Sequence, residues 1–340
     1  MTRTPRNDDL IVVLGATGTL GTYLVDALVE SNYAVFATGR KNVVKDYYTS
    51  KGVQCALLDI SRKEDFDRLP GTGVRAVIQI AGAMPARMAG YDPQKYIDSN
   101  ITGTLNVLNY CRKVNVKKMM FTQSHSDVAG YWNTGKFIPS ESPRSIVYKG
   151  DHAVYIISKN AAVDLIEHYH QEYGLQTIVL RLPSIFSYRP GMEMYVNGEK
   201  RVAAYKIMIN KAIAGEDLEI WGDPGRAKDA VYVKDFCQIV MKAIESDNGQ
   251  GIYNVGTGIP TTLEEQIKGI AKVFSPKDKQ LKFIYRPEKR SQDGYLYDIS
   301  KAVHDFGYKP EYPYIEMLED MKREMSGHRF EHLANADIRI

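Results

Sequence analysis

The stretch that decides the fold is Gly15-Ala-Thr-Gly18-Thr-Leu-Gly21, which directly follows the apolar run Leu10–Leu14 and opens the helical pattern Leu20–Ser31. Glycines at this spacing permit a tight turn and let the backbone approach a phosphate closely. A helix N-terminus then offers free N–H groups and a positive dipole end to a pyrophosphate. We therefore predict that this loop binds a dinucleotide, through Gly15, Thr17, Gly18, Thr19, Leu20 and Gly21.

Short apolar runs and helical patterns alternate on from this loop. Strands are predicted at 34–38, 53–58, 76–80, 118–122 and 177–181, and helices at 100–114 and 155–173. Such alternation predicts βαβ units, and the nearly all-apolar strands fit a parallel sheet covered on both faces. The fold class is therefore α/β, a doubly wound parallel sheet of Rossmann type with a smaller α/β substrate-binding lobe.

The alternation of strand and helix patterns stops after Pro183, and we place the predicted domain boundary there. Residues 187–228 are rich in Gly, Pro, Tyr and charge, with one helix predicted at 202–214 that ends at Gly215. We predict an NAD(P)-binding domain over 1–182, a smaller substrate-binding lobe over 183–330, and a tail over 331–340. Residues 229–258 resume a strand-and-helix pattern and are predicted to return to the first domain.

Composition narrows the classes of function. The chain has 340 residues, 44% of them hydrophobic, and a net charge of +3, which gives no reason to propose nucleic acid or a membrane as partner. The polar start of the chain lacks the apolar stretch of a signal peptide, and no apolar run approaches a bilayer span. Three cysteines (Cys55, Cys111, Cys237) lie far apart without metal-ligand spacing. We expect a cytoplasmic protein with no metal site.

The end of the second predicted strand bears on the choice of dinucleotide. It reads Thr38-Gly39-Arg40-Lys41 and lacks the carboxylate that would bind the ribose 2′-hydroxyl of NAD. Arg40 can pair with a 2′-phosphate, so NADP is favoured over NAD. Arg40 could instead be a solvated loop charge or stack on the adenine. Loops after the third and fourth strands are predicted to line the cofactor through Asp59, Ile60, Ala81, Gly82 and Ala83.

Tyr155-Ile-Ile-Ser-Lys159 places a phenol and an ammonium one helical turn apart on one face. A free phenol has a pKa of about 10, and a nearby ammonium is expected to lower it toward neutral pH. Tyr155 is therefore predicted to be the general acid and base, while Lys159 also holds the nicotinamide ribose.

A turn after the fifth strand, Phe121-Thr-Gln-Ser124-His-Ser126-Asp127-Val-Ala-Gly130, carries candidate hydroxyls. One of them would hydrogen-bond the substrate oxygen beside Tyr155. Measured from the strand, Ser124 fits this role best, with Ser126 second. The unused serine could bond its own backbone, and His125 could contact substrate or be incidental.

These motifs occur in family order together with Asn100-Ile-Thr-Gly103-Thr104 and Arg181-Leu-Pro183. The chain resembles an extended short-chain dehydrogenase/reductase of the NAD-dependent epimerase/dehydratase group over roughly residues 10–320. Segments from Trp221 to Asp235, Tyr253 to Gly258 and Asp298 to Ala302 extend the resemblance into the second half.

The resemblance implies a nucleotide-sugar substrate and a homodimer formed through the helices at 100–114 and 155–173. It also implies cofactor contacts from Asn100 and Pro183, and substrate contacts from His125, Ser184, Arg226, Lys228 and Arg290, the last three as cations for a diphosphate. Lys228 stands where the family commonly has arginine, and lysine lacks the bidentate fork of arginine. Each of the three cations could instead be a solvated surface charge.

The leading function is a nucleotide-sugar epimerase that acts by transient hydride transfer. The alternative is an NADPH-dependent reductase or dehydrogenase of a keto-sugar or other carbonyl substrate, which Arg40 favours. Two minor alternatives are a dehydratase and a non-catalytic NAD(P)-binding sensor. The family's dehydratases usually carry an Asp-Glu pair after the Ser/Thr, whereas Asp127 is followed here by Val128. The Tyr155/Lys159 pair argues against the sensor.

Overall fold

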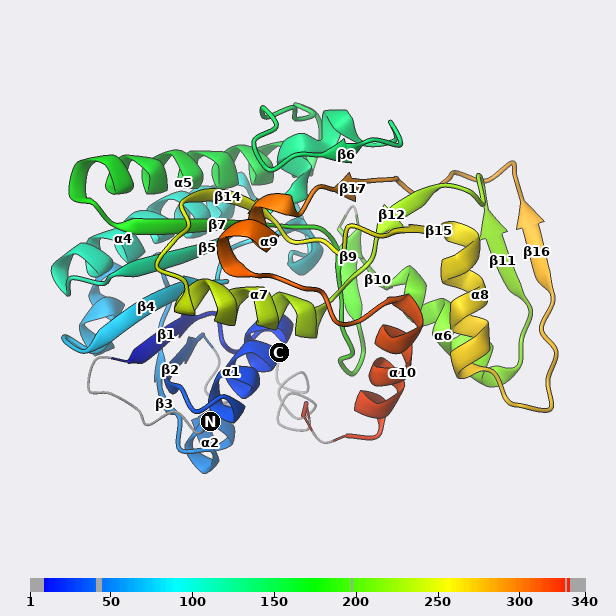
Figure 1. The fold of residues 1–340 in the computed structure, drawn as a ribbon, viewed down its shortest axis with the longest axis horizontal. Coiled ribbons are helices and arrows are strands. Elements are labelled where there is room, and N and C mark those ends of the chain that lie inside the picture. Colours follow the sequence, from blue (N-terminus) through cyan, green and yellow to red (C-terminus); the bar gives the residue numbers. More distant parts are fainter. Residues whose placement is uncertain (1–8, 41–44, 197, 328, 331–340) are drawn as a thin grey trace.

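The computed structural model describes residues 9–40, 45–196, 198–327 and 329–330, and a seven-stranded sheet forms its centre (Figure 1). The strands lie in the order β14-β7-β5-β4-β1-β2-β3, and all neighbours are parallel. Their bounds are β1 Leu10–Leu14, β2 Ala34–Gly39, β3 Gln54–Leu57, β4 Val74–Gln79, β5 Lys118–Ser124, β7 Gln176–Leu182 and β14 Gly251–Asn254. The predicted doubly wound fold is confirmed. The strand order reverses between β1 and β4, where ligands of such sheets bind.

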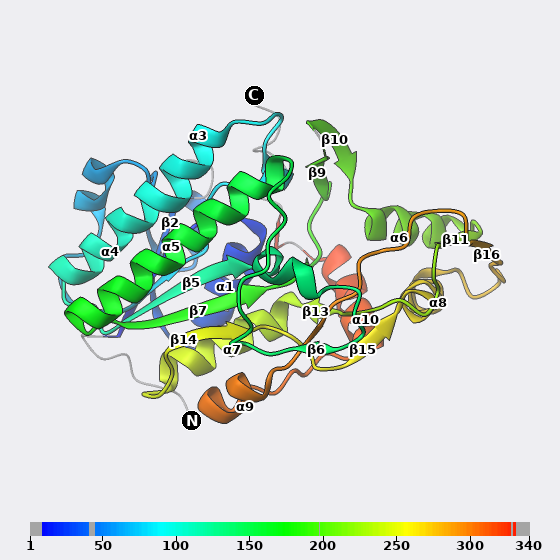
Figure 2. The same ribbon diagram turned by 90° about the horizontal axis from the view of Figure 1, so that it is seen from above.

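Helices cover both faces of this sheet, and β1 shows why. Ile11 and Val13 join one apolar cluster with α1 and α7, while Val12 and Leu14 join another with α4 and α5. Alternate residues of a strand point to opposite faces, so a strand buried on both sides is apolar throughout. Figure 2 shows α4 and α5 side by side over one face. The helices around the sheet are α1 Thr19–Glu30, α2 Lys45–Ser50, α3 Pro93–Tyr96, α4 Gly103–Lys113, α5 Asp151–Tyr173, α7 Val233–Glu245 and α9 Ser300–Phe306.

A smaller lobe lies beside the carboxyl edge of the sheet. Its elements are the hairpin β9 Glu193–Val196 and β10 Glu199–Val202, the parallel pair β11 Leu218–Trp221 and β16 Phe283–Arg286, and the helices α6 Ala204–Ala214, α8 Leu263–Phe274 and α10 Tyr314–Met325. Short pairs join it to the sheet's loops: β6 Phe137–Ile138 with β17 Leu296–Tyr297, β8 Ile185–Phe186 with β13 Val231–Tyr232, and β12 Ala227–Asp229 with β15 Pro260–Thr262.

The two lobes share one apolar core. A single cluster runs from α1 and α7 into α6, α8 and α10. The domain limits at 182 and 330 therefore stay predictions. The pairing of β14 with β7 in the large sheet supports the predicted return of residues 229–258 to the first domain.

Several element limits differ from the sequence prediction. Val202, the expected start of a helix, ends β10, and α6 begins at Ala204 and ends at Gly215 with the left-handed backbone expected there. The β9–β10 hairpin was not predicted, because most of its residues are exposed and show no alternation of buried side chains. The helix expected from residue 100 is preceded by a π-helical segment at Ile97–Thr102, and α5 begins four residues before Tyr155.

Arg181 on β7 is the largest fully buried side chain, at 1% exposure. Its Nε donates to both carboxylate oxygens of Asp127 (2.9 and 3.0 Å), and its Nη1 donates to the Ser140 carbonyl (3.0 Å) and the Asn254 side chain (2.8 Å). Burial raises the pKa of the Asp127 carboxyl, although Arg181 opposes that rise. Asp127 is thus bound to a structural cation and is absent from the residues that line the cavity described below.

Among the described residues, no helix is long and apolar enough to cross a membrane, and no group of three or more His, Cys, Asp or Glu side chains could hold a metal ion. The three cysteines are free thiols, two of them buried.

Candidate active site

A cavity of about 410 Å³ opens at the carboxyl ends of β1, β4, β5 and β7, beside the reversal of strand order. The second lobe closes it with residues of β9 and α6, among them Met194 and Tyr205. The predicted site residues that line it are Thr19, Leu20, Gly82, Ala83, Ser124, His125, Ser126, Tyr155, Lys159, Pro183 and Ser184. Residues from five separate loops and helices therefore meet in one space, as the order of the motifs predicts.

Tyr155 and Lys159 project from one face of α5 and are 8% and 5% exposed. The Tyr155 phenol shares a hydrogen bond with the Ser124 side chain at the end of β5. The Lys159 ammonium lies 3.8 Å from the centroid of the Phe121 ring, a cation–π contact. Ser126 lines the same cavity, and its backbone N–H donates to the Ser124 hydroxyl (3.3 Å). Ser124 is thus the hydroxyl next to the phenol.

The pKa of Tyr155 differs from the sequence expectation. Burial raises it to about 12, although the hydrogen bond with Ser124 opposes the rise. Burial also lowers the pKa of Lys159 to about 7. Desolvation disfavours the charged form of each group. The lowering of the Tyr155 pKa by the Lys159 ammonium, which the residue spacing predicts, is not found. Additional positive charge in the cavity is needed before Tyr155 becomes a base near neutral pH.

The glycine loop has the geometry of a phosphate cradle. Gly15 has a positive φ (+96°), and a Cβ there would lie 2.7 Å from the Ala81 backbone nitrogen. A Cβ on Gly21 would lie 2.3 Å from the Gly15 carbonyl oxygen, so only glycine lets α1 pack this closely. No side chain caps the N-terminus of α1 and no acidic residue lies in its first turn, while the buried Thr19 hydroxyl has no hydrogen-bond partner. These donors fit a dinucleotide pyrophosphate.

Three other predicted cofactor residues, Arg40, Asp59 and Ile60, lie in different surroundings. Arg40 is exposed at the end of β2, and the space above Gly39 is filled by the Thr17 side chain. Burial alone would raise the pKa of Asp59, but hydrogen bonds from Ser61 and the charge of Arg40 hold it below the ordinary value. Ile60 is buried against Gly103 and does not line the cavity.

Asn100 braces the loop that follows β4. Its side chain accepts from the Ala83 N–H (2.9 Å) and donates to the Ala83 carbonyl (3.1 Å) and to Ser158 of α5 (2.9 Å). A Cβ at Gly82 would lie 2.7 Å from the Asn100 oxygen. Asn100 thus ties the Ala81–Ala83 loop to the helix that carries Tyr155, and it is 1% exposed.

The model of the "NAD dependent epimerase/dehydratase family" matches residues 11–256. The chain belongs to this family. It is accordingly an enzyme of the extended short-chain dehydrogenase/reductase type. A putative UDP-glucose 4-epimerase of Methanocaldococcus jannaschii is 28% identical to it over 319 residues, which cover 92% of this chain and 96% of that protein.

Solved structures agree on the fold. The UDP-glucose 4-epimerase of Thermotoga maritima with UDP-glucose has a TM-score of 0.75 and 24% identity, over 94% of this chain and all of that one. The UDP-glucose 4-epimerase of Thermus thermophilus in complex with NAD has a TM-score of 0.72 and 22% identity, over 92% and 99% of the two chains.

The cations that the epimerase/dehydratase resemblance implies for a diphosphate do not line the cavity. The Arg226 guanidinium donates to Asn133 (2.6 Å), and the Arg290 side chain is 87% exposed beside Asp293. Burial lowers the pKa of Lys228 to about 8, and its ammonium lies 5.2 Å from the Phe186 ring centroid. Nothing in this arrangement brings the three together.

Two arginines that were not predicted from the sequence, Arg87 and Arg189, also line the cavity. Arg87 lies in a short 3-10 turn after β4, and Arg189 lies in the loop after β8. Their guanidinium groups donate to the same carbonyl oxygen, that of Glu193 on β9 (3.4 and 2.8 Å). His152, one turn before Tyr155, is a third overlooked lining residue. No local motif marks these positions, because their meeting depends on how the hairpin packs.

His125 sits in an aromatic cluster at the wall of the cavity. Its Nδ1 lies 2.9 Å from the Tyr297 hydroxyl, and its ring centroid lies 4.6 Å from those of Trp132 and Tyr295. Burial lowers the pKa of His125 to about 3, and nearby positive charges add to the effect. His125 is therefore neutral at pH 7 and can offer a substrate hydrogen bonds and packing but no charge.

This pKa predicts a pH dependence of stability. Between about pH 6.5 and pH 3 the unfolded chain protonates His125 while the native protein does not, so the free energy of unfolding falls as pH falls. We expect the His125 contribution to cost about 1–2 kcal/mol between pH 7 and pH 5. Urea unfolding at both pH values should show a smaller loss for His125→Phe than for the wild type. Replacing exposed His168 with Asn is the control, and an equal loss in His125→Phe would contradict the prediction.

Proposed function

We propose that the chain is an NAD(P)-dependent nucleotide-sugar epimerase with a Ser124-Tyr155-Lys159 site. The observation that carries the proposal is that one cavity holds the Ser124–Tyr155 hydrogen bond, Lys159 and the uncapped start of α1. Relatives named as UDP-sugar epimerases, in Methanocaldococcus jannaschii and elsewhere, support the class of substrate.

When bound, the dinucleotide supplies a hydride acceptor and donor, and a positive charge in its oxidised form. With the dinucleotide bound, Tyr155 would take the proton of a sugar hydroxyl when that carbon is oxidised to a keto group. Ser124 would donate a hydrogen bond to the same oxygen, and a protonated Lys159 would stabilise the phenolate form of Tyr155. After the keto-sugar has turned, Tyr155 would return the proton when the carbon is reduced from its opposite face. No net oxidation occurs.

Replacing Tyr155 with Phe tests the catalytic role. The change removes the proton carrier but keeps the ring that packs against Tyr96, so we expect turnover to fall by about 10²–10⁴ while dinucleotide affinity stays near the wild-type value. Epimer formation measured by chromatography and binding measured by calorimetry give the two quantities. Tyr173→Phe, on the same helix, is the matched control. Undiminished turnover in Tyr155→Phe would sink the mechanism.

We also propose that the enzyme prefers NADP. The support is Arg40 alone, exposed at the end of β2 where no carboxylate stands; the Thermus relative was solved with NAD. A charge-assisted contact predicts that Arg40→Gln weakens NADP binding about tenfold and leaves NAD binding unchanged. Calorimetry with both dinucleotides measures this, with Arg62→Gln, a second cation near Asp59, as control. Equal wild-type affinities for NAD and NADP would refute the preference.

The second candidate, an NADPH-dependent reductase, rests on the same arginine. A reductase consumes one reduced nicotinamide per turnover, whereas an epimerase leaves the total unchanged. Following nicotinamide absorbance during product formation therefore separates the two functions.

For the nucleotide diphosphate, we propose Arg87 and Arg189 as the gripping cations. Two guanidinium forks from different loops converge in the cavity, an arrangement that suits paired phosphates. Arg189→Gln should weaken UDP binding about tenfold in calorimetry. Arg290→Gln distinguishes the two assignments: if it loses UDP affinity and Arg189→Gln does not, the cations implied by the resemblance are the correct ones.

The homodimer remains a proposal. It is supported by apolar side chains that are exposed along α4 and α5, namely Leu105, Ile157 and Tyr173.

A further inference from the structure

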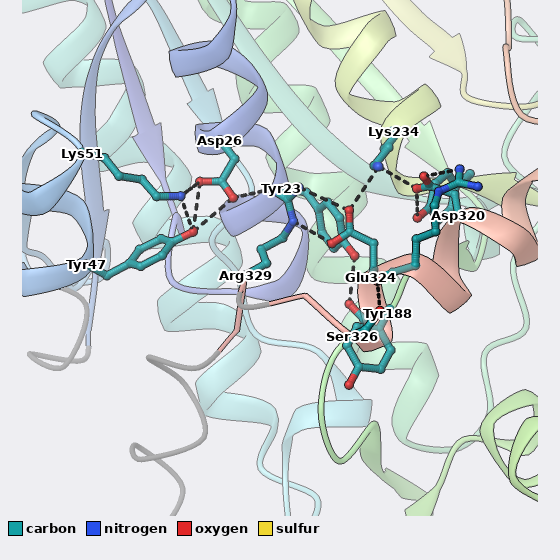
Figure 3. Close-up of polar contacts among 12 residues, drawn as sticks. Tyr23, Asp26, Tyr47, Lys51, Tyr188, Lys234, Asp320, Glu324, Ser326 and Arg329 are labelled. Carbon is teal, nitrogen blue, oxygen red and sulfur yellow. Dashed lines mark hydrogen bonds and ion pairs between the residues drawn. The ribbon is translucent and has the colours of Figure 1, made fainter.

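A chain of ion pairs joins Arg329, which follows α10, to the helix that begins at the glycine loop (Figure 3). Asp26 of α1 is 3% exposed and lies at its centre. The Lys51 ammonium lies 2.5 Å from its Oδ1, and the Arg329 guanidinium pairs with its Oδ2. The Tyr47 hydroxyl lies 3.1 Å from both oxygens. Asp26 therefore ties α1 both to the α2 region and to the segment after α10.

Arg329 holds two carboxylates at once. Its Nε and Nη2 donate to the two oxygens of Glu324 (3.0 and 3.3 Å) while Nη1 pairs with Asp26. Its guanidinium carbon lies 4.7 Å from the centroid of the Tyr23 ring. Phe330, 2% exposed, packs edge-on against the same ring at 5.4 Å. The segment after α10 is thus docked on α1 by charge and by ring packing.

Ion pairs and a hydrogen bond also hold α10, which carries Glu324, against α7 and Tyr232. Glu324 and Asp320 of α10 both pair with Lys234 of α7 (3.1 and 2.6 Å), and the Tyr232 hydroxyl donates to Asp320 (2.7 Å). Burial alone would lower the pKa of Arg329, but Glu324 and Asp26 outweigh it and raise the pKa. Arg329 therefore remains charged and connects an anchored α10 to α1.

The contact has consequences for the dinucleotide site. Tyr23, which Arg329 and Phe330 cover, lies one turn after Thr19 on α1. Lys51 and Tyr47 belong to the region that follows β2 and Arg40. The network therefore contacts both α1 and the α2 region, which border the adenosine and pyrophosphate end of the proposed site.

We infer that Arg329 is a positioning residue for the dinucleotide site, acting through Asp26 on α1. Without Arg329, Lys51 still pairs with one oxygen of the buried Asp26 carboxylate, but the other oxygen loses its cation. A buried oxygen without that partner is unfavourable, so α1 is expected to shift until the oxygen is solvated. The inference rests on the proposed dinucleotide function, and it assigns the segment after α10 a role in cofactor affinity rather than in chemistry.

The test compares full-length Arg329→Gln, Arg329→Lys and Arg323→Gln with the wild type by calorimetry, using NADP, NAD and UDP as ligands. We expect Arg329→Gln to weaken dinucleotide binding about three- to tenfold with UDP affinity within about twofold of wild type. Arg329→Lys keeps the charge and should restore part of the loss. Arg323→Gln breaks an ion pair to Asp320 on the same helix without touching α1, and should bind as wild type.

Each outcome decides a separate claim. Unchanged dinucleotide affinity in Arg329→Gln overturns the inference, as does an equal loss of dinucleotide and UDP binding, which would indicate general destabilisation. If Arg329→Gln does not fold, wild-type dinucleotide affinity in Arg329→Met, which keeps a side chain over the Tyr23 ring but removes the charge, overturns it instead. If the wild type binds neither dinucleotide, the proposed function fails first and the inference falls with it.

Discussion

A single buried cation organises the carboxyl edge of the sheet. Arg181 has no access to solvent, and a buried charge is tolerated only when it is paired and hydrogen-bonded. Asp127, the Ser140 carbonyl and the Asn254 side chain come from three different segments and accept hydrogen bonds from its Nε and Nη1, whereas its buried Nη2 has no hydrogen-bond partner among the described residues. Because Ser124 stands three residues before Asp127, the position of the turn that carries Ser124 follows from this pairing. Asn254 likewise fixes the end of β14 beside β7, so the outer strand and the active-site turn depend on the same guanidinium.

Burial of the side chains near the cavity also determines their charge. Burial moves the pKa of Tyr155 up, and those of Lys159 and His125 down, and in each case it disfavours the charged form. The Tyr155 phenol is therefore neutral near pH 7. The positive charge of an oxidised dinucleotide would act on it in this poorly screened space and would lower its pKa.

The sequence predicted what local rules determine, and missed what packing determines. The glycine loop, the apolar strands and the Tyr155/Lys159 spacing are written in short stretches, and the structure places them as expected. Arg87 and Arg189 lie far apart in the chain and meet only at Glu193 of a hairpin that carries no buried alternation. Asn100 was expected to touch the cofactor, but its partners Ala83 and Ser158 are visible only in three dimensions. The pKa of Tyr155 could not be predicted from spacing, because burial depends on the whole fold.

The distribution of charge in the cavity bears on how an epimerase can work here. The sugar must turn between the two hydride transfers, so it has to be held loosely while the rest of the substrate is held firmly. Arg87 and Arg189, the cations proposed for the diphosphate, would supply strong and directional contacts to it. The neighbours of Tyr155 include the uncharged Ser124, Met88 and Tyr96, and the His152 ring, whose centroid lies 6.0 Å from that of Tyr155. An enzyme that gripped the sugar ring with charges would stabilise one face over the other and slow the turn. The proposed epimerisation thus depends on a loose hold on the ring, unlike a reaction that needs a single fixed orientation.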